Sequence, residues 1–346
     1  MSALYPLLLR PEFVERPWGA RDLSPVYPGH RCEKPVGEVW LTGDENRVAN
    51  GPLAGRTLGE LCREYGRALV GKSARETVRF PLLIKFLFPR EKLSVQVHPD
   101  DEAAHRAGQP CGKTECWYVL AADPGAQVAL GLKPGTTREQ LARAIQEVRA
   151  EELLNWVDIH AGEMIYVDAG TVHTIGPGSI LVETQQNSDT TYRLYDYGRP
   201  REIHVEQGLA ATKERTRAGK VEPWVVHENL MPLVWSPCFM VAKHRLGPKA
   251  DLSMEHVHTE PQGRRKVDIL VALDGSGMIE SDGMPPVNFG RGEAVAVPAA
   301  VDRFRVLPDP AVEFLSMQVP QPGEVEEPET TLEKATKLTS KVKRRR

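Results

Sequence analysis

Apolar and polar residues alternate over short stretches along most of the chain. Residues 93–98 read Leu-Ser-Val-Gln-Val-His, and similar β-branched or aromatic runs, bounded by turn residues, recur at 116–120, 164–168, 180–183, 267–272 and 294–298. Period-two alternation sends successive side chains to opposite faces of a strand. Many short runs separated by glycine- and proline-containing turns are typical of antiparallel all-β folds. The pattern therefore predicts a mainly β protein.

Two segments have helical spacing instead. Residues 57–65 begin with Thr57, a residue type that caps helix N-termini, and residues 136–148 place Leu141, Ala144, Ile145 and Val148 on one stripe. We expect these segments to form helical insertions among the strands, at about residues 57–66 and 136–157.

Each half of the chain contains a similar twelve-residue element. Residues 162–173 align with residues 292–303, each starting with Gly-Glu and continuing through a short apolar run. We infer two related β-barrels, one in residues 1–210 and one in residues 225–320, joined by a connection at 211–224. From residue 321 the apolar pattern is lost, which predicts a disordered tail through residue 346.

Composition and charge narrow the classes of partner. The 346 residues are 41% hydrophobic and carry a formal net charge of -3, so we expect a globular, two-domain protein that binds small molecules. The basic residues 337–346 are interpreted as a solvated end, and nucleic acid is not an expected partner. The apolar run at residues 4–9 is far shorter than the ~20 residues that span a membrane. Five scattered cysteines suit a reducing compartment, so we expect a cytoplasmic protein without a membrane partner.

The strand at residues 93–98 has an unusual polar face. Alternation puts Val95 and Val97 on one side and Ser94, Gln96 and His98 on the other. Burying Gln or His without a partner costs roughly 1–3 kcal/mol. A metal ion inside a barrel would satisfy them, whereas a hydrogen-bonded core histidine is the alternative for His98 alone.

A carboxylate, Glu115, and a second histidine, His173, follow in the order found in the two sequence elements of cupins, which are double-sheet jelly-roll barrels. Two imidazoles and one carboxylate suit catalytic zinc, with Gln96 able to add its amide oxygen. The same set also suits non-haem iron, so these residues alone do not name the metal. Cys111 and Cys116 lack the C-x-x-C spacing and are interpreted as free thiols.

Five motifs resemble those of type I mannose-6-phosphate isomerases, in particular the shorter bacterial form. They lie at residues 80–86, 93–101, 112–115, 169–173 and 183–193, in the order of that family, and beyond residue 210 the likeness is only architectural. The resemblance implies two cupin-like jelly-roll barrels and an aldose–ketose isomerase that works through an enediol. It also implies one Zn²⁺ per chain, bound by His98, Glu115 and His173 with Gln96 as a further ligand, and an active-site arginine at Arg193.

The proton-transferring base is left open among Glu183, Lys113 with a pKa lowered by the metal, and a zinc-bound hydroxide. A sugar phosphate also needs cations away from the metal, and Lys85 and Arg193 are the candidates, with hydroxyls from Ser94 and Thr114. Trp18 is expected to line the pocket or to lie in the core.

Each of these cations has an alternative. Lys85 could extend to the surface along its apolar run, and Arg193 could pair with Asp189 or Asp196.

For the oligomeric state, we favour a monomer.

The second barrel departs from the ligand pattern. His256 and His258 imitate a ligand pair, but Arg303, or Asp302 after a shift of one, occupies the position that matches His173. We therefore expect no metal in this barrel. Rival functions are an iron-dependent cupin oxygenase and a non-catalytic sugar-binding cupin. The lysine and arginine complement argues against the first, and Glu115, Lys113 and Arg193 favour catalysis over the second.

Overall fold

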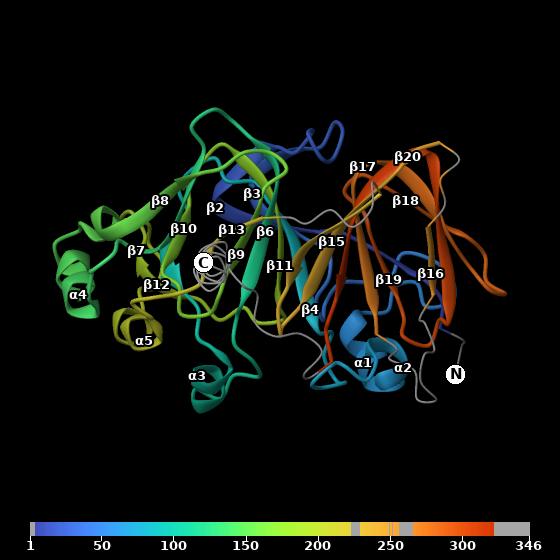
Figure 1. Ribbon diagram of the computed structural model, residues 1–346, viewed down its shortest axis with the longest axis horizontal. Coiled ribbons are helices and arrows are strands. Elements are labelled where there is room, and N and C mark those ends of the chain that lie inside the picture. The colour runs from blue at the N-terminus through green and yellow to red at the C-terminus, as the bar shows by residue number, and fades with distance from the viewer. Residues whose placement is uncertain (1–3, 223–228, 249, 251, 256–265, 322–346) are drawn as a thin grey trace, which may run out of the picture. The chain divides into compact units, whose positions relative to one another are not determined.

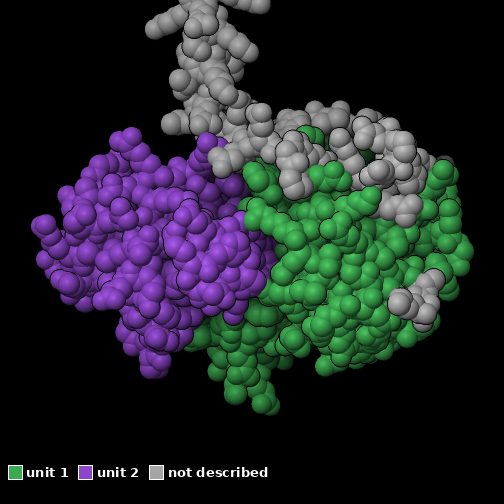
Figure 2. Space-filling view, turned by 90° about the horizontal axis from the view of Figure 1, so that it is seen from below, with its two compact units in different colours: residues 1–88, 223–326 green, residues 89–222, 327–346 purple. Residues whose placement is uncertain are grey.

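A computed structural model describes residues 4–222, 229–248, 250, 252–255 and 266–321. The chain is built mainly from antiparallel β-strands, which confirms the predicted fold class (Figure 1). It divides into two compact units, coloured separately in Figure 2. Unit 1 contains residues 1–88 and 223–326, and unit 2 contains residues 89–222 and 327–346.

Unit 2 contains two groups of antiparallel strands. The first has the order β13 (Gly219–Val221), β9 (Met164–Val167), β6 (Glu115–Ala122) and β11 (Ser179–Gln186). The second is a five-stranded sheet in the order β12 (Tyr192–Tyr195), β5 (Val95–Val97), β10 (His173–Ile175), β7 (Gln127–Leu132) and β8 (Leu154–Asp158). Side chains of β6 and β10 contact each other, so the inner faces of these two groups lie together.

Helices cover the outer face of the five-stranded sheet. Val95 and Val97 are fully buried in a cluster with Leu141 of α4 (Arg138–Gln146), Ala150 of η1 (Ala150–Leu153) and Leu209 of α5 (Val205–Ala211). Figure 1 shows α4 and α5 beside this sheet. With its apolar face covered in this way, β5 turns its polar face into the interior of the unit.

Unit 1 is organised around two long strands, β17 (Asp268–Ser281) and β20 (Arg303–Gln318). They belong to a sheet with β14 (Leu230–Trp235), β15 (Met240–Leu246), β16 (Leu252–Glu255), β18 (Val287–Gly290), β19 (Ala294–Val297) and β1 (Leu7–Leu9). Its core is apolar, with Phe289, Phe304 and Phe314 among the buried side chains. The unit also contains β2 (Glu12–Asp22), β3 (Arg31–Trp40), β4 (Leu82–Leu87), α1 (Leu58–Tyr65) and α2 (Arg67–Val70).

The compact units divide the chain differently from the predicted domains. Leu7–Leu9 of β1 pairs antiparallel with β19, which groups the first residues of the chain with its last strands. In the predicted connection at 211–224, β13 pairs with β9. The domain bounds 1–210 and 225–320 stay a prediction. Residues 322–346, where a disordered tail is predicted, lie outside the described residues.

The predicted helices form with small corrections. Thr57 and Thr137 cap α1 and α4, each in a capping box. The prediction that Val148 lies on the apolar stripe of its helix is wrong, because α4 ends at Gln146 and Val148 is 63% exposed with φ of 59°. Residues 154–157 are in β8 and not in a helical insertion. Helices α2, α3 (Asp101–Arg106) and α5 were not predicted.

No helix among the described residues is long and apolar enough to cross a membrane.

Replacing Thr57 with Ala is expected to lower the free energy of unfolding by about 1 kcal/mol, because the Glu60 backbone N–H loses its hydroxyl acceptor and the capping box opens. Urea denaturation monitored by circular dichroism measures the change. Thr57→Ser keeps the acceptor and serves as the control. Equal destabilisation by both substitutions would show that the cap contributes nothing.

Candidate active site

Three side chains that can bind a metal ion converge inside unit 2. His98 follows β5, Glu115 begins β6 and His173 begins β10. One ligand atom from each lies within 4.8 Å of the others, and each residue is about 1% exposed. Residues far apart in the sequence therefore form one buried cluster between the two groups of strands.

Backbone carbonyls set the orientation of both imidazoles. Nδ1 of His98 lies 2.9 Å from the carbonyl oxygen of Thr190, and Nδ1 of His173 lies 2.9 Å from that of Thr171. A carbonyl only accepts, so each Nδ1 carries the proton and each Nε2 carries a lone pair that can accept a hydrogen bond or bind a metal ion. The two Nε2 atoms lie 3.5 and 3.3 Å from the Glu115 carboxylate. Burial lowers the pKa of His173 to about 4, which keeps this ring neutral.

The cluster already holds a positive group. The Lys113 ammonium lies 3.0 Å from Oε2 of Glu115 and 3.1 Å from Nε2 of His98. Two of the three potential ligands thus face a cation, and the donor set of two neutral imidazoles and one carboxylate fits a divalent metal ion. Burial would lower the pKa of Lys113, but the Glu115 and Glu183 carboxylates raise it above its usual value. The lowered pKa expected for Lys113 depends on a bound metal, and the carboxylates act in the opposite direction.

Gln96 and Arg193 lie in one row with His173. Gln96 stands directly opposite His173 of β10 and opposite Arg193 of β12, so the three residues share a face of the sheet. Nε2 of Gln96 is 3.2 Å from Nε2 of His173, and the Ser94 hydroxyl donates to Oε1 of Gln96 at 3.0 Å. Ligation through the amide oxygen therefore requires a half-turn of this amide.

The strands on the other side contribute a second carboxylate. In the register of β6 with β11, Glu115 lies opposite Gln185, and Trp117 lies opposite Glu183. The Trp117 indole N–H donates to Glu183 at 3.1 Å, and the Trp117 ring meets the His173 ring edge-on at 5.6 Å. Glu183 thus lies on the same inner face as Glu115. Its side chain is buried, at 5% exposure, and it does not belong to the cluster of three potential ligands.

Lys85 and Trp18 belong to unit 1. Lys85 is 2% exposed and so does not extend to the surface; its ammonium lies 3.8 Å from Glu38 and 5.1 Å from the centre of the Trp40 ring. Burial opposes ionisation of Glu38, but Lys85 and Arg16 lower its pKa to about 2.

Trp18 is buried, at 3% exposure, and it packs against Gly37 so closely that a Cβ there would lie 2.7 Å from its ring. Trp18 is therefore a buried side chain of unit 1, and its contact with a substrate stays a prediction. Sequence reasoning missed Glu38, since a single acid in a strand is no signal of a buried partner.

The second repeat has a different residue where the first has His173. Arg303 begins β20 as His173 begins β10, but Arg303 is exposed. His256 and His258 lie outside the described residues.

Among the described residues, the cluster of potential ligands in unit 2 contains no cysteine. The Cys111 thiol donates to the carbonyl of Asn187 at 3.6 Å, and Cys116 is a buried free thiol.

Comparisons with known proteins agree on one family. Residues 9–124 match the family model described as the catalytic domain of type I phosphomannose isomerase. Mannose-6-phosphate isomerase ManA of Bacillus subtilis is 35% identical over 87% of this chain and 95% of its own length. Mannose-6-phosphate isomerase of Streptococcus mutans is 37% identical over 70% of this chain and 79% of its own.

Solved structures extend the likeness to the fold. The mannose 6-phosphate isomerase from Bacillus subtilis covers 90% of this chain and 99% of its own with a TM-score of 0.79 and 29% identity. A variant of phosphomannose isomerase from Salmonella typhimurium gives a TM-score of 0.74 over 91% of this chain and 99% of its own. At 16% identity, that second likeness concerns the fold alone.

Removing one ligand is expected to weaken metal binding without unfolding the protein. In Glu115→Ala and His173→Ala, we expect zinc affinity to fall by at least about tenfold, because two donors no longer complete the set. Isothermal titration of the metal-free protein with Zn²⁺ measures it, and circular dichroism checks folding. His160→Ala, at an exposed position, is the control. Unchanged affinity in both ligand variants would place the metal elsewhere.

Proposed function

This chain belongs to the type I phosphomannose isomerases, and from that membership we propose that it interconverts D-mannose 6-phosphate and D-fructose 6-phosphate in unit 2. The observation that carries the proposal is the buried convergence of His98, Glu115 and His173. The relatives named as mannose-6-phosphate isomerases support the substrate, because the alignments cover most of both chains. The cupin-like, mainly β fold is shared with the solved isomerase structure.

We propose that the metal is one Zn²⁺ per chain, held by His98, Glu115 and His173, with Gln96 adjacent. Two imidazoles and a carboxylate leave a position open, which is typical of catalytic zinc. Moving a carbonyl within one sugar exchanges no electrons with another molecule, so an ion without redox chemistry is sufficient. When bound, such an ion polarises substrate oxygens as a Lewis acid.

Glu183 is the best-supported base for the proton transfer. It is a carboxylate on the inner face that does not belong to the ligand cluster, and the Trp117 indole N–H donates to one of its oxygens. In the proposed step, Glu183 removes the proton from C2 of the open-chain aldose, and the C–H electron pair forms a C1–C2 double bond. The π pair of the C1 carbonyl moves onto O1, which takes up a proton to give the enediol. Return of a proton to C1, with loss of the O2 proton, forms the ketose.

Lys113 and Arg193 would supply positive charge to this reaction. The Lys113 ammonium, placed between Glu115 and His98, can donate to a substrate oxygen that gains charge in the enediol. Arg193 shares the sheet face of Gln96, and its planar fork suits the phosphate or a sugar oxygen. Asp196, an alternative partner for Arg193, already pairs with Arg199 and Arg201.

Lys85, Ser94 and Trp18 stay predicted substrate contacts. Lys85 is the most constrained of these, because a phosphate would have to compete with Glu38 for its ammonium. For the cellular location we propose the cytoplasm, and the five free cysteines support a reducing environment.

Chelation is expected to abolish isomerase activity, and stoichiometric Zn²⁺ is expected to restore it, because no described side chain replaces the charge of a divalent ion. A coupled assay on mannose 6-phosphate, with metal analysis of the same sample, tests this. Parallel addition of Fe²⁺ with an oxygen electrode tests the oxygenase alternative. Full turnover by protein verified to be metal-free would contradict the proposal.

Arg193→Ala is expected to keep zinc at the wild-type level and to lower kcat/KM by about 100-fold, near 3 kcal/mol, as for loss of one preorganised donor. Arg193→Lys should recover only part, since an ammonium lacks the planar fork. Steady-state kinetics, zinc content and Tm are measured together, with Arg201→Ala as the control. Reduced Tm with normal kinetics would remove Arg193 from the active site.

A further inference from the structure

Each of the three residues before Glu115 donates its backbone N–H to a different acceptor. The N–H of Gly112 donates to Oδ1 of Asp101 at 2.9 Å, and the N–H of Lys113 donates to the carbonyl of Pro99 at 3.0 Å. The N–H of Thr114 donates to Oε1 of Gln186 at 2.9 Å. Residues 112–114 precede β6, whose ladders hold Glu115 itself, so these contacts determine where Lys113 lies.

Asp101 and Gln186 act on this segment as a linked pair. Nε2 of Gln186 donates to the same Oδ1 of Asp101 at 2.9 Å, so one carboxylate oxygen joins α3, the end of β11 and the segment 112–114. The backbone N–H of Gln186 also donates to the carbonyl of Thr114 at 3.2 Å. Loss of either side chain therefore releases more than one hydrogen bond.

The segment also packs tightly against residues 99–101. A Cβ added to Gly112 would lie 2.5 Å from the carbonyl carbon of Asp100 and 2.6 Å from the nitrogen of Asp101. Real Cβ atoms do not approach backbone atoms so closely, and hence only glycine fits at position 112. This close contact brings the Asp101 carboxylate within reach of the segment.

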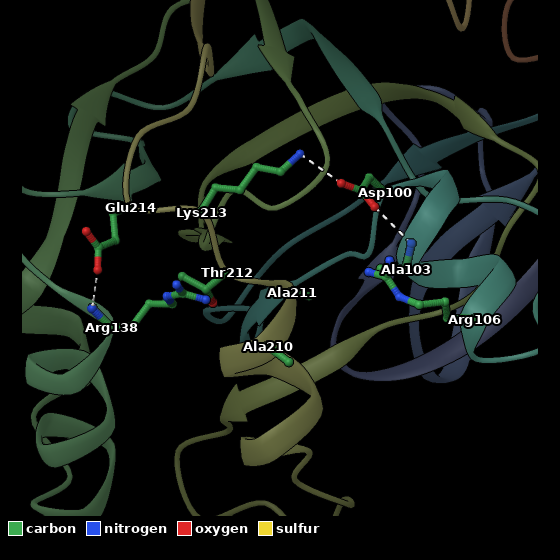
Figure 3. A pocket seen from close by; sticks show the side chains of 9 residues that line it. All are labelled: Asp100, Ala103, Arg106, Arg138, Ala210, Ala211, Thr212, Lys213 and Glu214. Atoms are coloured by element: carbon green, nitrogen blue, oxygen red, sulfur yellow. Dashed lines mark hydrogen bonds and ion pairs between the residues drawn. The ribbon is translucent and has the colours of Figure 1, made fainter.

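The start of α3 is itself anchored, as Figure 3 shows. The Asp100 carboxylate accepts from the N–H of Ala103 at 3.0 Å and pairs with the Lys213 ammonium at 3.0 Å, on the edge of a cavity of about 400 Å³. The backbone N–H of Lys213 donates to Gly170, whose N–H donates to the carbonyl of His98. Asp101 is thus presented from a helix start that is tied to the ligand strands.

We propose that Asp101 and Gln186 are positioning residues that hold Lys113 in place beside Glu115 and His98 for metal binding and catalysis. They act through the backbone of residues 112–114, because their side-chain hydrogen bonds there end on the N–H groups of Gly112 and Thr114 and on each other. The inference rests on the proposed function for its catalytic part, and on the ligand cluster alone for its metal part. It requires the acceptor oxygen of Asp101 but not its negative charge.

A double-mutant cycle with Lys113 tests the catalytic part. Asp101→Ala is expected to lower kcat/KM by about 10- to 100-fold, the scale for a small displacement of a catalytic group, and Asp101→Asn should recover most of the loss because Oδ1 remains. In the Lys113→Ala background, Asp101→Ala should lower kcat/KM by less than about a further twofold, since the side chain that Asp101 positions is gone. Equal losses in both backgrounds, or an Asn variant as impaired as Ala, would overturn the inference.

Cobalt(II) substitution tests the metal part without turnover. Asp101→Ala and Gln186→Leu should shift the visible spectrum of the Co²⁺ protein or weaken Co²⁺ binding at least about threefold, because the Lys113 ammonium, which lies against Glu115 and His98, moves with the segment. Asp158→Ala, which breaks a carboxylate–glutamine hydrogen bond between β7 and β8, is the matched control and should change neither.

These two measurements separate failure of the positioning role from failure of the proposed function. If the wild-type protein does not isomerise mannose 6-phosphate, the proposed function fails, and the Co²⁺ spectra still decide the positioning role. If Asp101→Ala does not fold, Gln186→Leu and Asp101→Asn carry both measurements. Wild-type spectra together with wild-type kcat/KM in the folded variants would overturn the inference.

Discussion

The Glu115 carboxylate, which is only 1% exposed, faces two imidazoles and an ammonium. Burying a charge of this kind is unfavourable unless groups of opposite polarity are fixed around it. Much of unit 2 serves this requirement. The apolar face of β5 is covered by helices so that its polar face can turn inward, and the carbonyls of Thr171 and Thr190 point one lone pair of each histidine at Glu115. The helices that lie outside the sheet thus support the site by covering the apolar face of β5.

Sequence patterns predicted the parts of the fold that local physics determines. Alternation at residues 93–98 gave both faces of β5 correctly, and Thr57 was predicted as the cap at which α1 begins. Helices α3 and α5 were missed because they are six and seven residues long and have no amphipathic repeat to detect. Val148 was placed in a helix because its apolar character matched the stripe, although the chain had already turned into a left-handed conformation.

The sequence predicted those parts of the site that depend on the type of a side chain. It did not predict the parts that depend on backbone groups. His98, Glu115 and His173 follow from their types and order, and the structure brings them together. The carbonyls of Thr171 and Thr190 leave no trace in the sequence, since every residue has one. The partnership of Lys85 with Glu38 depends on pairing between β3 and β4, and cross-strand neighbours cannot be read without the register. The repeat that ends in Arg303 contributes Val295, Val297 and Val301 to an apolar core.

The pairing of β1 with β19 has a consequence for synthesis on the ribosome. Leu7 and Leu9 are buried by strands that include Ala294–Val297, so the first strand to be made waits for one of the last. At about 5–20 residues per second, roughly 15–60 s separate the emergence of Leu7 from that of Ala296. During that interval an apolar strand edge is without its partner, and such edges are prone to pair with other chains. For most of the time of translation, the nascent chain therefore has to keep β1 from pairing with other chains. In the folded protein β19 pairs with β1, and this requirement ends.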